Sequence, residues 1–232
     1  MTLRIVHLYP RELGMFGDVG NVIALQMRAR WSGIVASVES VGVSDAVPEN
    51  ADIYMIGSGS TAGLRAVAEA MPTLARSLTR AHSAGATVIA IGAGLQLLGS
   101  RVDIADGESV DGAGLIDATS TLRVERLVGP LSGSVGKQGV TGYVNSGHRL
   151  SGTFNPLVEQ IEGLSIESDG VNADGILGTH LHGPFLPMNP KFADDIIEKH
   201  TGVAVYQDDP RVSRATEAAS HSRVALRREL GL

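Results

Sequence analysis

Short apolar runs alternate with segments of helical periodicity through the first 91 residues. Four of these runs are brief, continuous and rich in aliphatic residues, which is the pattern of strands buried on both faces. They span residues 3–9, 34–41, 52–56 and 87–91. Between them, residues 21–31 and 64–82 repeat apolar side chains at helical spacing, and Asn21 is the expected N-cap of the first helix. This alternation predicts a parallel sheet covered by helices on both faces, with ligands at the carboxyl ends of its strands.

The pattern changes over residues 102–168, where short apolar runs are separated by Asp-Gly, Ser-Gly and Glu-Gly pairs. Such turn signals predict antiparallel strands and hairpins. One more strand is expected at 176–181, followed by a helix over about 190–199 with Asn189 as its N-cap. The tail from Asp208 onward carries arginines, glutamates and few apolar residues, which predicts a surface helix.

Composition limits the class of protein. The chain has 232 residues, a formal net charge of −6 and 4% aromatic residues. We expect one α/β domain over residues 1–205, with residues 206–232 as its C-terminal surface helix. An acidic chain with few aromatic residues lacks the basic face and stacking platforms of a nucleic-acid-binding protein. The longest stretch without charged residues, 81–100, is interrupted by glycines, so no membrane span is expected. Residues 1–9 do not form a signal peptide, and a cytoplasmic location is predicted.

A glycine loop at residues 57–62 (GSGSTA) follows the third predicted strand and precedes a helix. Its spacing is compatible with the dinucleotide-binding turn of an oxidoreductase, with an anion- or oxyanion-binding loop, or with an ordinary tight turn. The dinucleotide interpretation is weakened because the loop follows the third strand and no acidic residue stands about 20 positions later.

His180 and His182 lie two positions apart at the end of the last predicted strand, so both side chains are expected on one face. The pair is compatible with a metal site, a structural histidine, or a catalytic base at a strand end. No acidic or histidine cluster with ligand spacing accompanies it, and no metal is predicted.

The most informative segment is 88–99, VIAIGAGLQLLG. A strand, a sharp glycine turn and a helix follow one another, as in a nucleophile elbow, and an ordinary glycine-rich turn is the alternative. In an elbow, the backbone N–H of Ala93 faces a developing oxyanion. The elbow residue is Gly92, which has no side chain, and the chain contains no cysteine. The absence of cysteine also excludes disulfides, thiolate metal sites and a cysteine nucleophile.

Four segments together resemble the class I, triad-type glutamine amidotransferases of the CobB/CobQ-like branch. Residues 9–21 are similar to that branch's YGDxGN loop, and residues 56–59 to its glycine loop. Residues 90–99 are similar to its AICGGxQLLG elbow, and residues 178–190 (GTHLHGPFLPMNP) to its GTYLHGPLLxxNP motif. Within the branch, the chain most resembles the GatD-like glutaminase subunits.

The resemblance implies a flavodoxin-like three-layer fold with a mostly parallel central sheet. It implies hydrolysis of glutamine to glutamate and ammonia, with His182 as the base beside a cysteine nucleophile at position 92. It also implies contacts to the oxyanion and to glutamine. These are Gly57, Gly59 and Ala93 for the oxyanion, and Gln96, Arg126 and Asn145 for glutamine.

A partner is also implied by the resemblance. GatD-like subunits form a heterodimer with a MurT-like Mur-ligase subunit, which uses the ammonia to amidate the D-glutamate of lipid II in peptidoglycan synthesis. ATP and Mg²⁺ are expected on that ligase, and no cofactor is expected on this chain.

The chain departs from the family pattern at four positions. Gly92 replaces the cysteine, and Ser60, Val144 and Ser146 stand where the family often has Gln, Glu and His. We expect no glutaminase turnover from this chain, because loss of a nucleophile typically costs several orders of magnitude in rate. Either one cysteine was replaced in an active enzyme, or the protein is a natural pseudo-amidotransferase that binds glutamine or stabilises a partner. The clustered departures favour the second explanation.

Overall fold

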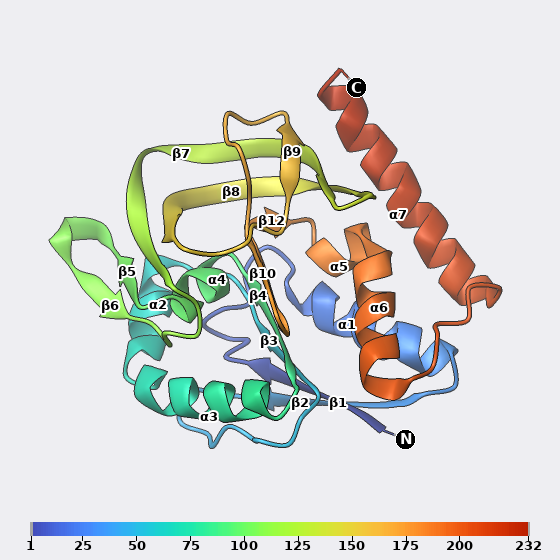
Figure 1. The fold of residues 1–232 in the computed structure, drawn as a ribbon, viewed down its shortest axis with the longest axis horizontal. Coiled ribbons are helices and arrows are strands. Elements are labelled where there is room, and N and C mark those ends of the chain that lie inside the picture. The colour runs from blue at the N-terminus through green and yellow to red at the C-terminus, as the bar shows by residue number, and fades with distance from the viewer. Residues whose placement is uncertain (1, 232) are drawn as a thin grey trace.

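The computed structural model describes residues 2–231, apart from the side chain of Asp106. Its central sheet has the strand order β10-β11-β4-β3-β1-β2 (Figure 1). All neighbouring pairs are parallel except β10 with β11. The strands are β1 Thr2–Leu8, β2 Val35–Val41, β3 Ile53–Ile56, β4 Thr87–Ile91, β10 Val171–Ala173 and β11 Ile176–Thr179. The four strands predicted in the first half of the chain are therefore confirmed, with ends shifted by at most one residue.

Helices cover both faces of this sheet, which gives an α/β fold of three layers (Figure 1). On one face, Leu25 of α1 and Ile197 of α6 belong to the core that includes Ile5 of β1. On the other face, the core joins Leu78 of α3 to Ile56 of β3. The helices are α1 Val19–Trp31, α2 Thr61–Ala68, α3 Met71–Ser83, α4 Ala93–Leu98, α5 Phe185–Met188, α6 Pro190–Thr201 and α7 Pro210–Glu229. The predicted fold class is confirmed.

A second sheet, with the order β12-β8-β7-β5-β6 and β9 paired to β7, lies beside the first. Because β12 follows β11 after one residue and pairs with β8, this sheet stands next to the carboxyl ends of the central strands. Its strands are β5 Arg101–Asp103, β6 Ser109–Asp111, β7 Ala118–Val135, β8 Gln138–Gly152, β9 Glu159–Glu162 and β12 Leu181–His182, with a short 3-10 helix, η1, at Ala105–Gly107.

The antiparallel strands predicted over residues 102–168 are confirmed except for β5, which runs parallel to β7. In addition, β7 and β8 form one hairpin much longer than the short runs suggested. Several glycines that looked like turns lie inside its strands instead. A Cβ at Gly133 would stand 2.6 Å from Val158 Cγ1, and one at Gly147 would stand 3.1 Å from Arg126 Nη1. These glycines allow close approach of neighbouring chain segments, which is the other common role of glycine in a strand.

The single helix predicted at 64–82 is wrong, since α2 and α3 are separate helices with Glu69 and Ala70 between them. Pro72 stands in the first turn of α3, where its missing N–H leaves no helical hydrogen bond unmade. The apolar spacing continues across the break, so periodicity alone did not reveal it.

The predicted N-cap at Asn21 is also wrong. Helix α1 begins at Val19 after Asp18, and the buried Asn21 side chain instead accepts a hydrogen bond of 2.8 Å from the Leu186 N–H. Asn189 does precede α6, but its side chain makes hydrogen bonds to the backbone of Thr141 and Phe185 and does not cap the helix. Both asparagines therefore join distant segments.

The strand predicted at 176–181 ends two residues early, because the chain leaves the central sheet at His180 and enters the second sheet as β12. His180 and His182 therefore do not share one face of a single strand, which corrects the prediction. The Thr179 hydroxyl and the His180 N–H both donate to Asp169, at 2.6 and 3.1 Å, and these bonds hold the chain at the crossing point.

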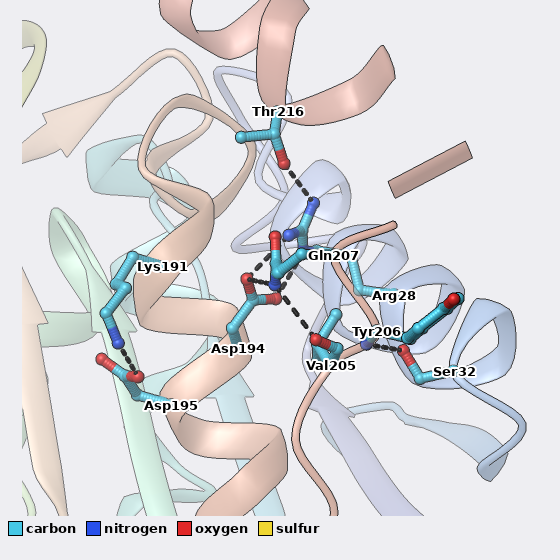
Figure 2. Close-up of polar contacts among 9 residues, drawn as sticks. All are labelled: Arg28, Ser32, Lys191, Asp194, Asp195, Val205, Tyr206, Gln207 and Thr216. Atoms are coloured by element: carbon cyan, nitrogen blue, oxygen red, sulfur yellow. Dashed lines mark hydrogen bonds and ion pairs between the residues drawn. The ribbon is translucent and has the colours of Figure 1, made fainter. Parts of the chain in front are cut away.

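The C-terminal helix α7 packs along one side of the molecule, and its surface location confirms the prediction (Figure 1). Arg28 of α1 forms a bidentate ion pair with Asp194 of α6, at 2.6 and 2.7 Å, and also donates to Thr216 of α7 (Figure 2). Gln207 donates to the same carboxylate at 3.0 Å. The pair is largely buried and joins three helices. Between residues 2 and 231, no helix combines the length and hydrophobicity needed to span a membrane.

Candidate active site

Four segments that the sequence singled out meet at one edge of the central sheet. They follow β1, β3, β4 and β11, and begin at Tyr9, Gly57, Gly92 and His180. Because these strands are parallel, their carboxyl ends lie together, which is where ligand sites form in open α/β sheets. The local hydrophobic pattern of the strands is thus what gathers the motifs.

Gly92 forms a sharp turn between β4 and α4, with φ +54° and ψ −111°. L-residues with side chains rarely adopt this conformation, and glycine adopts it with little strain. The Gly92 N–H donates to the Thr179 carbonyl oxygen at 2.8 Å, and its own carbonyl accepts from the Gln96 N–H at 3.1 Å. The backbone geometry of an elbow is therefore present without an elbow side chain.

The side chain of Ser58 occupies the space in front of Gly92. A Cβ built on Gly92 would stand 2.4 Å from Ser58 Oγ and 2.9 Å from Ser58 Cβ, closer than such atoms approach in proteins. The same Cβ would stand 3.2 Å from His182 Cε1. Ser58 Oγ also accepts a hydrogen bond of 3.4 Å from the Ala93 N–H, the group predicted to face an oxyanion.

His182 is buried on β12 and points toward the elbow. Its Nδ1 lies 3.9 Å from Oδ1 of the buried Asp18, and neither atom has a hydrogen-bond partner within residues 2–231. The other oxygen of Asp18 accepts a hydrogen bond of 2.5 Å from the Ser58 N–H. The Phe16 ring lies over His182, with 4.5 Å between the ring centroids. Asp18 thus positions the Ser58 loop while facing the imidazole.

The glycine loop is packed tightly against the segment that follows β1. The Gly57 carbonyl accepts from the Gly94 N–H at 2.9 Å, so it holds the start of α4. A Cβ on Gly59 would stand 2.5 Å from the Glu12 carbonyl oxygen, which explains the glycine. Ser60 caps α2 by accepting a 3.2 Å hydrogen bond from the Gly63 N–H, a local role for one of the four departures.

The predicted glutamine contacts come from the β7–β8 hairpin and from α4, and they line the same cavity as Ser58. Arg126 of β7 lies within the register shift of the hairpin, between Leu122 and Leu127, and donates to the Asn145 side chain of β8. Gln96 of α4 is buried, and its Oε1 has no hydrogen-bond partner within the described part of the chain. An unpaired amide oxygen of this kind is available to a ligand donor.

The structure brings most of the predicted site residues to one cavity of about 100 Å³. Those that line it are Gly59, Gly92, Ala93, Gln96, Arg126, Asn145 and His182. Gly57 lies behind the lining. Cavities that hold small ligands typically measure about 300–1,000 Å³, so this cavity is small in comparison. Of the remaining departures, Ser146 lines the cavity and Val144 is buried beside Leu181.

Sequence reasoning assigned no role to Ser58, Asp18 or Asp169. Ser58 and Asp18 stand within motifs that were singled out, and an acidic residue in a glycine-rich loop was an available signal for Asp18. Asp169 forms a hydrogen bond with the His180 ring from a different segment of the chain, and no local sequence pattern marks this contact. No group of three or more metal-ligating side chains occurs among residues 2–231.

Comparisons with known proteins agree with this geometry. A CobB/CobQ-like glutamine amidotransferase domain matches residues 4–190. The GatD subunit of the glutamine-hydrolysing lipid II isoglutaminyl synthase of Staphylococcus aureus is 29% identical, over 85% of this chain and 84% of the relative. The GatD subunit of Streptococcus pneumoniae is 28% identical, over 82% and 77%.

Solved structures show the same fold. A glutamine amidotransferase of Thermotoga maritima superposes with a TM-score of 0.54 and 13% identity, over 97% of this chain and 93% of that one. PurLQS from the same organism gives 0.51 and 15%, over 78% and 88%. With the family match extending over most of the chain, this protein belongs to the CobB/CobQ-like glutamine amidotransferase family.

Proposed function

We propose that this chain is the amidotransferase-type subunit of a lipid II isoglutaminyl synthase, and that in the form given by this sequence it does not hydrolyse glutamine. Its partner in this proposal is a MurT-like Mur-ligase subunit, which carries ATP and Mg²⁺ and amidates the D-glutamate of lipid II. Support comes from the two GatD relatives, which match more than four-fifths of the chain. His182, Arg126 and Asn145 line a common cavity, as such a subunit requires.

The position of Ser58 carries the part of the proposal that concerns hydrolysis. A thiolate at position 92 would begin at a Cβ only 2.4 Å from Ser58 Oγ. The Ala93 N–H that would stabilise an oxyanion already donates to the same hydroxyl. The site therefore lacks the nucleophile, and one of its oxyanion donors is occupied by Ser58, which weakens the two main contributions to acyl transfer.

Ser58 also supports the explanation that the protein is a natural pseudo-amidotransferase, and not an active enzyme in which one cysteine was replaced. Rotation of the serine side chain would move Oγ, but the 2.9 Å approach of its Cβ to a Cβ at position 92 does not depend on that rotation. A parent with cysteine at position 92 and serine at position 58 would therefore be crowded. Glycine at position 92 together with serine at position 58 is consistent with two substitutions that arose together.

The proposal is tested by measuring ammonia release from L-glutamine, with the purified chain alone and in complex with a Mur-ligase-like partner. We expect no release above the rate without protein. As a control, the complex is supplied with ammonium chloride, and amidation of lipid II then shows that the ligase is active. Robust ammonia release by the Gly92 chain would refute the proposal that the site is inactive.

The small cavity favours a second candidate function, in which the chain stabilises its partner without holding glutamine. Titration calorimetry with L-glutamine separates the two candidates. Saturable binding that is lost in Arg126→Gln supports a glutamine-holding subunit. Absence of binding, together with a higher melting temperature of the ligase in the complex, supports the stabilising role.

A further inference from the structure

A second cavity, of about 380 Å³, lies between the β7–β8 hairpin and the loop at residues 163–170. It is separate from the elbow cavity but shares a wall with it, since Ser146, His148 and His180 line both. Its volume falls in the range typical of small-molecule sites, whereas the elbow cavity lies below that range. The predicted site residues Gly92, His182 and Arg126 are not part of its lining, so it is not explained by the proposed function.

Two arginines bring positive charge to this cavity. Arg123 of β7 is partly buried, and its Nε donates to the His148 carbonyl oxygen at 2.9 Å. Arg149 of β8 lines the same cavity. Burial lowers the pKa of Arg123, and the neighbouring positive charge of Arg149 lowers it further. Two arginines that line one cavity favour an anionic group on its ligand.

The acidic residues at the cavity offset part of this positive charge, and the charge of Asp169 acts on Arg123. Both oxygens of the buried Asp169 are already used, because Oδ1 pairs with His180 Nδ1 at 2.8 Å and Oδ2 accepts from Thr179 and the His180 N–H. These contacts hold the pKa of Asp169 below its usual value despite burial. Glu167 is exposed at the rim.

His180 provides an independent observation that points to a ligand. Its side chain is more than nine-tenths buried, and Asp169 fixes the ring through Nδ1. Its Nε2 is buried and has no hydrogen-bond partner within residues 2–231. Buried polar atoms in native proteins are nearly always paired, so this nitrogen is a contact point for a bound group. With Nδ1–H donating to Asp169, Nε2 carries the lone pair of the neutral ring and accepts from a ligand hydroxyl or N–H.

We propose that this cavity binds a small molecule through a carboxylate or a phosphate held by Arg123 and Arg149, with a hydroxyl or N–H group of the same molecule donating to His180 Nε2. The Asp169–His180 pair acts as a fixed support for that contact. Because the two cavities share the wall formed by Ser146, His148 and His180, a ligand here would lie next to the elbow.

The test uses the full chain, with inorganic phosphate and succinate as the two probes. Binding is followed by titration calorimetry and by the NMR signals of the His180 ring, which respond to a new partner at Nε2. We expect at least one probe to bind with saturation, with Arg149→Gln weakening it by about tenfold or more. Binding of phosphate alone supports a phosphate-bearing ligand, and binding of succinate alone supports a carboxylate ligand.

Two matched variants locate the site. Arg76→Gln removes one exposed arginine on α3, far from the cavity in sequence, and should leave binding unchanged. Arg126→Gln removes the arginine that lines the elbow cavity. The proposal is overturned if neither probe saturates at millimolar concentration, if Arg76→Gln weakens binding as much as Arg149→Gln, or if Arg126→Gln abolishes binding while Arg149→Gln leaves it intact.

Discussion

A cysteine placed at position 92 is expected to overlap Ser58, so that restoring the family's nucleophile alone should not restore a working elbow. The perturbation is a double-mutant cycle of Gly92→Cys, Ser58→Gly and the combined variant. A parallel cycle with Gly92→Ala adds the same Cβ without a thiol. The distances that predict the overlap are 2.4 Å to Ser58 Oγ and 2.9 Å to Ser58 Cβ.

The magnitude follows from two separate costs. Forcing extra atoms into a packed site costs about 1–3 kcal/mol. Holding a side-chain-bearing residue at φ +54° and ψ −111° costs about 1–3 kcal/mol more. We therefore expect Gly92→Cys to lower the free energy of unfolding by about 2–6 kcal/mol. Ser58→Gly removes only the first cost, so the two substitutions should be coupled by about 1–3 kcal/mol.

The free energies of unfolding are measured by urea titration, with circular dichroism as the signal. Because the chain has no other cysteine, alkylation at neutral pH reports the new thiol directly. We expect faster alkylation in the combined variant, where the thiol lies beside His182 and at the start of α4. A coupling energy below about 0.5 kcal/mol in both cycles would show that Ser58 does not fill the nucleophile's space.

Two further predictions concern stability. Asp194→Ala should lower the free energy of unfolding by about 3 kcal/mol or more, because it leaves the buried Arg28 guanidinium without its ion-pair partner (Figure 2). The control, Asp195→Ala, breaks an exposed ion pair and should cost less than about 1 kcal/mol. Equal losses in urea titration would contradict this. Burial lowers the pKa of His148 and of His200. Below the ordinary histidine pKa of about 6.5, the unfolded state therefore binds more protons than the folded state. The free energy of unfolding should fall as the pH drops from 7 toward 5. His200→Gln should flatten that pH dependence, and the exposed His221→Gln should not; an unchanged slope in His200→Gln would refute the assignment.

Much of the fold followed from local patterns. The four apolar runs of the first half became parallel strands within one residue of their predicted ends, since each run is long enough for a strand and too short for a helix. The break between α2 and α3 was missed because the apolar spacing continues across it. The crossing of the chain between sheets at His180 was missed because it depends on hydrogen bonds to Asp169, which local periodicity does not encode.

The candidate site was recognisable for a different reason. The local pattern placed Gly57, Gly59 and Gly92 in glycine-rich loops after strands, and the resemblance to the amidotransferases then assigned them to an oxyanion loop and an elbow. The absence of cysteine is a count, and it alone predicts that the elbow has no thiolate. The amino-acid sequence therefore determined the order of strands along the chain, the position of the elbow and the missing nucleophile.

Only the tertiary structure decided what stands in the nucleophile's place. The contacts of Ser58 with Ala93 and Asp18 join residues 35 and 40 positions apart, and the direction of each side chain is set by the packing of whole loops at the sheet edge. The same holds for the second cavity, whose arginines and His180 come from the hairpin and from the crossing between two sheets. Such contacts depend on how the ends of different strands are brought together. The sequence of one strand determines whether that strand is buried, but it does not determine which side chains from other segments lie next to the end of the strand.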